Sequence, residues 1–328
     1  MNKVFLFFFI VVAGSYLTTS AQDKNTPYLN KPLNQSNIRA VDLQTSGGSL
    51  TVIGANESEA RLEVYVRGNN GQELSKAEIE ARLNANYDLQ ISSDQGKLIA
   101  IAKNKGNIRD WKKSLSISFK AYVPQAASAQ LKTSGGSLSI DGINGMVEGK
   151  TSGGSIKIAN VHNNQVNLRT SGGSIQAENV AGNLSLITSG GSIQLANLKG
   201  NIEAKTSGGS IKATDVTGEL IAKTSGGSIK VDRMSGSADL GTSAGSTSVN
   251  MLQIDKYLTI DVSAGSVDLQ LPLQKGLDLN LQARKVNIPS LSNFSGALDK
   301  DSVVGKLNGG GAAVNVAVSV GSLTIHSN

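Results

Sequence analysis

The sequence predicts an all-β fold, a single-stranded parallel β-solenoid with about 18 residues per coil. The pentapeptide T-S-G-G-S starts at seven positions, which are Thr45, Thr133, Thr151, Thr170, Thr188, Thr206 and Thr224. From Thr133 onward the starts are 18 or 19 residues apart, and T-S-A-G-S follows at Thr242 and V-S-A-G-S at Val262. Self-similarity at a short, fixed period is typical of solenoid proteins.

Alternation of apolar and polar residues between the turns predicts short strands with one buried face. Each period divides into two similar halves of nine residues, as in TSGGSIKAT (206–214) and DVTGELIAK (215–223). Equivalent positions of successive periods form apolar columns that we expect in the core. The first half supplies Ile156, Ile175, Ile193, Ile211 and Ile229, and the second half supplies Val147, Val166, Leu184, Ile202 and Leu220.

The glycine pairs of the turns are expected to provide positive φ angles and close backbone approach. The Ser and Thr residues of successive turns should stack as hydroxyl ladders at the strand spacing of ~4.8 Å. One period, residues 160–169, lacks the glycine of its second half and has one extra residue at Asn163-Asn164.

The amino terminus predicts export. Residues 1–21 contain one Lys, an apolar run of about eleven residues and small residues at Thr19 and Ala21, which are the marks of a cleaved signal peptide. The apolar run is shorter than the ~20 residues that span a bilayer, and no later segment is long and apolar enough to do so. Residues 22–37, which are polar with two Pro, are expected to be a flexible leader.

Residues 38–328 are predicted to form one solenoid domain. Within it, residues 55–132 interrupt the period and are expected to cap the amino-terminal end, residues 133–275 are the regular coils, and residues 276–328 are carboxy-terminal coils and a cap. In the first cap, Ser75 to Glu78 form a capping box that begins a helix ending near Ala85. Four segments of this cap are predicted strands: 61–67, 87–92, 97–103 and 114–123.

Composition argues against most catalytic classes. The chain has no Cys and only two His, so a thiol nucleophile, a Cys-ligated metal and a Ser/His/Asp triad have little to build on. The turns also lack the Asp of calcium-binding β-rolls, since Ile occupies that place. We therefore expect no catalytic residue, no metal site and no cofactor.

The sequence resembles a bacterial family of candidate adhesins, related to the head domains of auto-transporter adhesins. The resemblance lies in the apolar amino terminus, the T-S-G-G-S periods, and the segments VYVRGN (64–69) and SISFKAYVP (116–124). It covers residues 38–328 and implies a β-helix in an envelope protein, with the right-handed crossover usual for parallel strands. Ala244 and Ala264 depart from the expected glycine.

A basic row is the candidate binding surface. From the second T-S-G-G-S turn onward, the residue before the turn is basic in five of six cases, and Ile187 is the exception. The five residues are Lys132, Lys150, Arg169, Lys205 and Lys223. Such a row would attract an acidic glycan or another anionic envelope polymer, while protection against edge-to-edge association is the alternative explanation. Nucleic acid is the weaker candidate, because no aromatic residues alternate with the basic ones.

The sequence thus favours a non-catalytic, exported cell-envelope protein that contacts glycans, in the periplasm, at the outer surface or secreted. A polysaccharide-active β-helix enzyme is the first alternative. One row contains outward acidic residues separated by uncharged ones, namely Asp141, Glu178 and Asp232. Two strand spacings amount to about 10 Å, which is more than the separation expected of a catalytic pair of carboxylates. The second alternative is an envelope scaffold that binds another protein.

Overall fold

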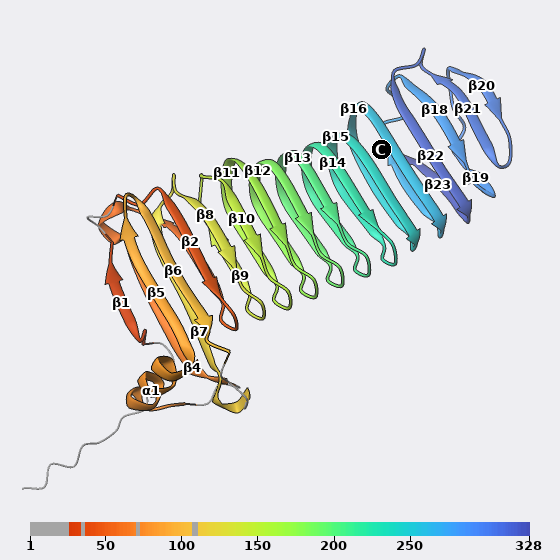
Figure 1. Ribbon diagram of the computed structural model, residues 1–328. Coiled ribbons are helices and arrows are strands. Elements are labelled where there is room, and N and C mark those ends of the chain that lie inside the picture. The colour runs from red at the N-terminus through yellow and green to blue at the C-terminus, as the bar shows by residue number, and fades with distance from the viewer. Residues whose placement is uncertain (1–25, 34–36, 70–72, 107–110) are drawn as a thin grey trace, which may run out of the picture.

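The computed structural model describes residues 26–33, 37–69, 73–106 and 111–328, and β-strands dominate them. The strands belong to one large, mostly parallel hydrogen-bonded sheet, which bends into an elongated stack (Figure 1). The predicted all-β class is therefore confirmed. The predicted signal peptide, residues 1–21, lies outside the described residues. No helix of the described part is both long enough and apolar enough to cross a bilayer.

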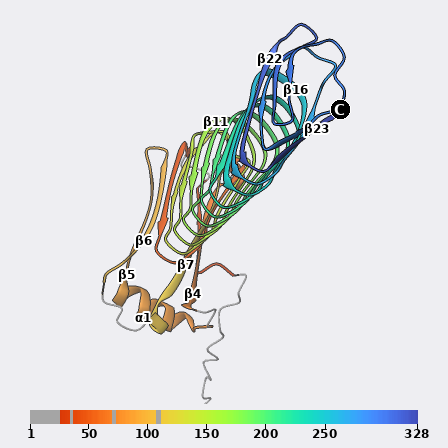
Figure 2. The ribbon, with the colours of Figure 1, turned by 90° about the vertical axis from the view of Figure 1, so that its right-hand side faces the viewer.

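The centre of the stack consists of parallel strands in register. We call each segment from one T-S-G-G-S turn to the next a layer. Ile156 pairs with Ile175, and Ile175 with Ile193, so equivalent residues of successive layers are neighbours. The strands are β8 (Ser128–Lys132), β9 (Leu138–Asp141), β10 (Val147–Lys150), β11 (Ile156–Arg169), β12 (Ile175–Ile187), β13 (Ile193–Lys205), β14 (Ile211–Thr224), β15 (Ile229–Ala244) and β16 (Thr247–Ala264). Seen from the end, these layers follow one another as similar narrow loops (Figure 2).

The core lies inside these loops and consists of the predicted apolar columns. All ten residues of the two columns are buried, with at most 3% of any of them exposed. Between these columns, the extra residue of the layer at 160–169 produces a bulge between His162 and Asn164, after which the register resumes. An insertion at the corner between two strand segments thus leaves the buried columns aligned.

Each T-S-G-G-S turn is bonded to the turn before it through its threonine. The Thr151 hydroxyl is buried, donates to the carbonyl of Gly136 in the preceding layer at 2.8 Å, and accepts from the Gly154 N–H of its own turn at 3.3 Å. The same pair of bonds recurs at Thr170, Thr188, Thr206 and Thr224. A single hydroxyl therefore satisfies groups of two layers.

The two glycines of the turn differ in what they permit. A Cβ on Gly154, the second glycine, would lie 2.0 Å from the carbonyl oxygen of Gly136, so only glycine allows the two backbones to approach this closely. A Cβ on Gly153, the first glycine, would come no nearer than 3.7 Å to a neighbouring atom. Ala244 and Ala264 occupy this first, roomier position, but the turn changes with them, because the glycine that follows has a positive φ of 144° at Gly245 and 153° at Gly265.

Positive φ angles occur elsewhere than predicted. The glycines of the T-S-G-G-S turns keep ordinary φ angles, whereas the glycines of the second halves have φ between 120° and 137°, as at Gly218 and Gly236. A second left-handed position lies at the corner of each layer, with φ between 53° and 56°. Its residues are Asn160, Asn179, Asn197, Asp215 and Arg233. Amide side chains tolerate this conformation, so the Asn residues fit it at little cost.

At the amino-terminal end, the first T-S-G-G-S turn is enclosed by the segment that follows it. Strand β2 pairs with β6 on one side and with β8 on the other, so the insertion, not the start of the chain, forms the end of the stack. The four predicted strands are confirmed. The elements are β2 (Ala40–Thr45), β3 (Leu50–Ala55), β4 (Arg61–Gly68), α1 (Lys76–Asn86), β5 (Tyr87–Asp94), β6 (Lys97–Asn104) and β7 (Leu115–Pro124), with 3-10 turns at Glu57–Glu59 and Trp111–Lys113.

The helix α1 and the leader can be compared directly with prediction. The Ser75 hydroxyl caps α1 by accepting from the Glu78 N–H at 3.3 Å, as the capping box predicted. The leader, expected to be flexible over 22–37, instead contains strand β1 (Leu29–Pro32), which pairs antiparallel with β4. Leu33 after it is 1% exposed. Burial of this one apolar side chain and pairing with an edge strand outweigh the polar composition of the segment.

The carboxy-terminal end repeats the same arrangement. Strand β22 pairs with β16 on one side and with β18 on the other, so the last layer of the chain lies inside the stack. Of the intervening strands, β17, β18 and β19 pair in parallel with strands of the stack, whereas β21 pairs antiparallel with β18 and β20. The elements are β17 (Val267–Leu271), β18 (Leu277–Gln282), β19 (Lys285–Asn287), β20 (Phe294–Leu298), β21 (Ser302–Leu307), β22 (Ala312–Val320) and β23 (Ser322–Ser327).

The contrast between the two turn glycines gives a matched test. Gly191→Ala would place a Cβ 2.0 Å from the Gly173 carbonyl oxygen, whereas Gly190→Ala would place one 3.6 Å from the nearest atom. We expect Gly191→Ala to lower the free energy of unfolding by about 3 kcal/mol, because the backbones of two layers must separate. Gly190→Ala should stay within about 0.5 kcal/mol of the unmodified chain. Equal losses in chemical denaturation would contradict this account of the turn.

Candidate functional site

The five basic residues predicted from the sequence lie in one row along the stack. Each of its residues pairs in register with its counterpart in the next layer, from Lys132 through Lys150 and Arg169 to Lys205 and Lys223. Ile187 interrupts it, and Gln44 and Gly241 continue it at the two ends. Lys132, Lys150, Arg169 and Lys205 are exposed, and Lys223 is half-buried.

The row is not uniformly cationic. Lys205 forms an ion pair with Glu203, and Lys223 forms one with Asp239 at 2.5 Å. No ion pair within 4 Å joins Lys132, Lys150 or Arg169 to another residue of the described part. Sequence reasoning treated all five as equivalent because it weighed the acidic residues of the neighbouring row, Glu148, Glu203 and Asp239, only as a catalytic cluster or not at all, and never as ion-pair partners. The uncompensated positive charge lies in the amino-terminal half of the row.

The ion pair at Glu203 holds this carboxylate in place. Ser185 of the preceding layer donates to Glu203 Oε2 at 2.9 Å, while the Lys205 ammonium contacts Oε1. The hydrogen bond from Lys205, followed by that from Ser185, lowers the pKa of Glu203 below its ordinary value. The carboxylate is therefore ionised at neutral pH and accepts hydrogen bonds from both sides.

A groove runs beside the basic row, across strands β11 to β14. Its volume is about 290 Å³, and its lining consists of amides, carboxylates and one hydroxyl over an apolar floor. The polar residues are Gln165, Asn167, Asn183, Ser185, Asn201, Glu203 and Glu219, and the apolar ones are Leu184, Ile202 and Ile221. The basic row and this groove share one outer face of the stack, which we call the groove face.

The polar lining of the groove is itself ordered by the stacking of layers. Asn201 donates from Nδ2 to the Asn183 Oδ1 of the preceding layer at 2.9 Å. At the far end, Tyr257 of β16 donates to Glu219 at 2.6 Å, and this hydrogen bond, with burial, raises the pKa of the tyrosine to about 12. Sequence reasoning missed this groove, although the recurrence of Gln165, Asn183 and Asn201 at one position of successive periods was visible.

The acidic row considered for an enzyme lies on the other side of the turn. Its residues pair in register as expected, but Asp141 and Asp232 accept hydrogen bonds from neighbouring layers. Asp141 accepts from Asn160 at 2.7 Å, and Asp232 accepts from Arg233 and from Asn250. Among the residues described, no group of three acidic or histidine side chains is placed to hold a metal ion.

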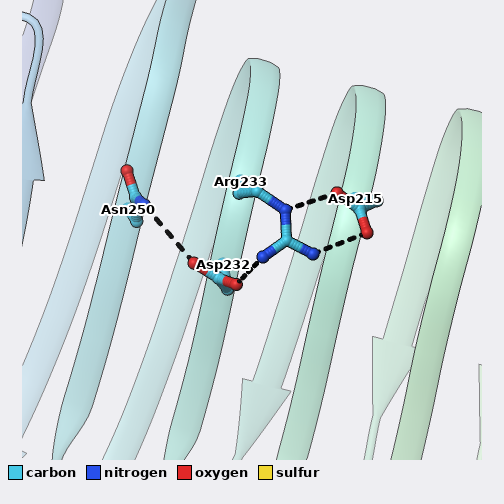
Figure 3. A network of polar contacts seen from close by, with 4 residues as sticks. All are labelled: Asp215, Asp232, Arg233 and Asn250. Atoms are coloured by element: carbon cyan, nitrogen blue, oxygen red, sulfur yellow. Dashed lines mark hydrogen bonds and ion pairs between the residues drawn. The ribbon is translucent and has the colours of Figure 1, made fainter.

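Arg233 is the central residue of the hydrogen-bond network that engages the carboxylates on this side of the turn (Figure 3). It occupies the left-handed corner position at φ 53°, where the preceding layers have Asn or Asp. Its guanidinium donates twice to Asp215, at 2.7 Å each, and once to Asp232 at 2.5 Å. The Arg233 hydrogen bond lowers the pKa of Asp215 below its ordinary range. With the bond from Asn250 to Asp232, the network joins three layers, and both carboxylates accept hydrogen bonds within it.

Neither a family model nor a curated protein sequence matches the chain. Two crystal structures are similar. One is a candidate cell adhesion protein from Clostridium sporogenes ATCC 15579, 11% identical, which covers 91% of this chain and 96% of its own at a TM-score of 0.25. The other is a candidate adhesin from Bacteroides fragilis NCTC 9343, 10% identical, which covers 88% and 93% at a TM-score of 0.35. At these values the function has to be argued from the surface of this chain.

The Glu203 contacts predict a measurable shift. Lys205→Ala should raise the pKa of Glu203 toward its ordinary value of 4.5, because the largest cause of the lowering is removed. Since the folded pKa lies below the ordinary one, ionised Glu203 stabilises the fold above the ordinary pKa, and this contribution is lost as the pH falls. Titration of the side-chain carboxyl by NMR measures the shift. Lys150→Ala is the control, and an unchanged Glu203 titration in Lys205→Ala would refute the contact.

Proposed function

We propose that the chain is an exported, non-catalytic cell-envelope protein that binds a linear acidic glycan along the groove face. The proposal takes the fold as a right-handed β-solenoid of about 18 residues per coil, over residues 38–328, that follows a signal peptide. In this reading the protein acts as an adhesin. Its ligand lies along the stack and crosses several layers.

The observation that carries the proposal is the groove across four successive strands, β11 to β14. Neighbouring strands are ~4.8 Å apart, so equivalent side chains repeat at nearly the spacing of sugar units in an extended polysaccharide. Amide and carboxylate groups such as Asn183, Asn201 and Glu219 are suited to the hydroxyls of sugars, as donors and acceptors. The apolar floor at Leu184 and Ile202 suits the C–H faces of the rings.

The charges on the groove face favour an acidic polymer. Lys132, Lys150 and Arg169 lie in adjacent layers and are exposed, and no carboxylate of the described part lies within 4 Å of their charged groups. Carboxylates or ester groups of a glycan would supply the missing partners. Toward the other end, Lys205 and Lys223 are paired with Glu203 and Asp239, so that part of the face suits neutral, hydroxyl-rich units. One ligand with acidic groups at intervals fits both halves.

An enzymatic role receives no comparable support. The acidic residues Asp141 and Asp232 accept hydrogen bonds from neighbouring layers, and Asp215 is bound to Arg233. A general acid for glycoside cleavage needs a proton near neutral pH, whereas the pKa of Asp215 is lowered. The groove carboxylate Glu203 is likewise held ionised by Lys205 and Ser185.

Charge reversal tests the basic half of the face. The triple variant Lys132→Glu, Lys150→Glu, Arg169→Glu should bind an acidic polysaccharide such as polygalacturonate at least about tenfold more weakly, because attraction becomes repulsion. The control is Lys157→Glu, Lys212→Glu, Lys230→Glu, which makes the same change in net charge on exposed positions of a different row. Affinity measured at several salt concentrations distinguishes the two. If both variants weaken binding equally, the effect is due to net charge alone, and the position of the basic row plays no part in binding.

The groove itself requires a separate variant. Asn183→Ala with Asn201→Ala should weaken binding by about three- to tenfold even at salt concentrations that screen charge, because hydrogen bonds to the sugar are lost. Gln176→Ala with Gln194→Ala is the matched control, since these exposed amides also lie in adjacent layers but outside the groove. If the groove variant retains full affinity for polygalacturonate, the glycan does not lie in the groove.

A further inference from the structure

A second depression lies on the first layers of the stack, across the T-S-G-G-S turn from the groove face. It has a volume of about 360 Å³ and is formed on the outer surface of three adjacent strands, β3, β7 and β4. Its polar lining consists of Ser49, Thr51, Tyr65, Arg67, Ser118 and Lys120. Among the residues that the structure describes, this lining contains four hydroxyls and two basic side chains and no carboxylate.

Strand register brings these side chains together from three distant parts of the sequence. Thr51 of β3 pairs with Lys120 of β7, and Tyr65 of β4 pairs with Ser118 of β7. The alternating residues of β7, such as Ile117 and Phe119, are buried, so Ser118 and Lys120 belong to the outer face. All of these residues precede the regular layers, so the depression arises only once the insertion has paired with β3.

The serine hydroxyls of the depression accept hydrogen bonds from backbone N–H groups, which leaves their own protons available to a ligand. Ser118 Oγ accepts from the Ser49 N–H at 3.0 Å, and Ser49 Oγ accepts from the Ser137 N–H at 3.3 Å. A hydroxyl whose lone pair is occupied by a backbone N–H still donates through its own O–H. Thr51 has a third hydroxyl on the same surface. Backbone bonding therefore biases Ser49 and Ser118 toward donating, which favours a ligand that accepts hydrogen bonds.

The acidic side chain that lies opposite Lys120 is already bonded at both of its oxygens. Glu63 lies opposite Lys120 in the β4–β7 pair, but its Oε1 accepts from Arg61 at 2.8 Å and its Oε2 from the Tyr65 hydroxyl at 2.8 Å. Burial of Glu63 raises its pKa, but the bonds from Arg61 and Tyr65 outweigh this and lower it overall, so it remains ionised. Arg61 compensates Glu63 and stacks over Tyr122 at 3.5 Å. No ion pair within 4 Å joins Lys120 to another residue of the described part, so its ammonium group keeps the depression positive.

We propose that this depression binds a tetrahedral oxyanion, the sulfate or phosphate ester of a small polar group such as a sugar. The ester oxygens would accept from Lys120 and from the hydroxyls of Ser49, Thr51 and Ser118. An ester anion accepts hydrogen bonds and donates none, so it matches a surface where Lys120 and the serine hydroxyls can donate while the Tyr65 hydroxyl is already bound to Glu63. A volume of about 360 Å³ accommodates a single sugar ring with its ester. The site is separate from the groove face and does not depend on glycan binding there.

Calorimetric titration of the mature protein at low salt tests the proposal, with glucose 6-sulfate, glucose 6-phosphate and glucose as probes. We expect one or both esters to bind and glucose to bind at least about tenfold more weakly. Preference for one ester identifies which anion the site takes. Absence of binding by both esters, or equal binding of glucose, would overturn the proposal.

Two variants locate the binding. Lys120→Gln should weaken ester binding at least about tenfold, since it removes a charge-assisted bond. Lys212→Gln is the control, because it lies outside the depression and its neighbour in the preceding layer, Gln194, is already glutamine. Thr51→Val removes one hydroxyl at nearly constant shape and should weaken binding about threefold or more. This second variant decides the matter should Lys120→Gln fold poorly. Full affinity in Thr51→Val and Lys120→Gln, with the esters bound, would place them elsewhere.

Discussion

The contact between a threonine hydroxyl and a glycine carbonyl of the preceding turn is the constraint on which the stack depends. Thr151 and its equivalents are buried, bonded at 2.8 Å to the layer before, and adjacent to glycines that tolerate no Cβ. A slip of one residue would lose this bond and would also turn each strand's apolar side chains outward. Because the turn permits only one register, equivalent residues of successive layers are forced into rows, and every surface property of the molecule is a property of rows.

Stacking identical polar residues in a row brings like charges together or leaves polar groups without partners, and this chain offsets the cost in several ways. In the corner row, Asn197 donates to Asn179, Asn179 donates to Asn160, and Asn160 donates to Asp141, so amide side chains satisfy one another along the stack. Where the row changes to Asp215 and Arg233, a bidentate ion pair takes over. In the basic row, Glu203 and Asp239 compensate two lysines. Within the described part, no ion pair joins Lys132, Lys150 or Arg169 to a carboxylate, so an anionic ligand would gain most by binding there.

The periodicity of the sequence was sufficient to predict the buried columns, the strands of the first cap and the basic row, because each depends on local alternation and on equivalence between layers. Other features depend on neighbours that no period reveals. The pairing of β2 with both β6 and β8 places the layer of Thr45 next to the layer that leads to the Thr133 turn, although an insertion that interrupts the period separates them in the sequence. The ion pairs of Lys205 and Lys223 use different partners, one on the same strand and one in the next layer, so only the structure distinguishes them.

The two ends of the stack follow from the same register. Strands β2 and β22 each have a parallel neighbour on both sides, so the outermost positions fall to the insertions, which close with antiparallel pairs such as β5–β6 and β20–β21. An edge made of short antiparallel strands offers a poorer template for further parallel layers than a T-S-G-G-S layer would. At the amino-terminal end, the same insertion that ends the stack also carries Tyr65, Ser118 and Lys120 to the first turn. The cap thus adds to the repetitive surface a cluster of side chains that no repeat could supply, which is why a ligand site of different chemistry arises there.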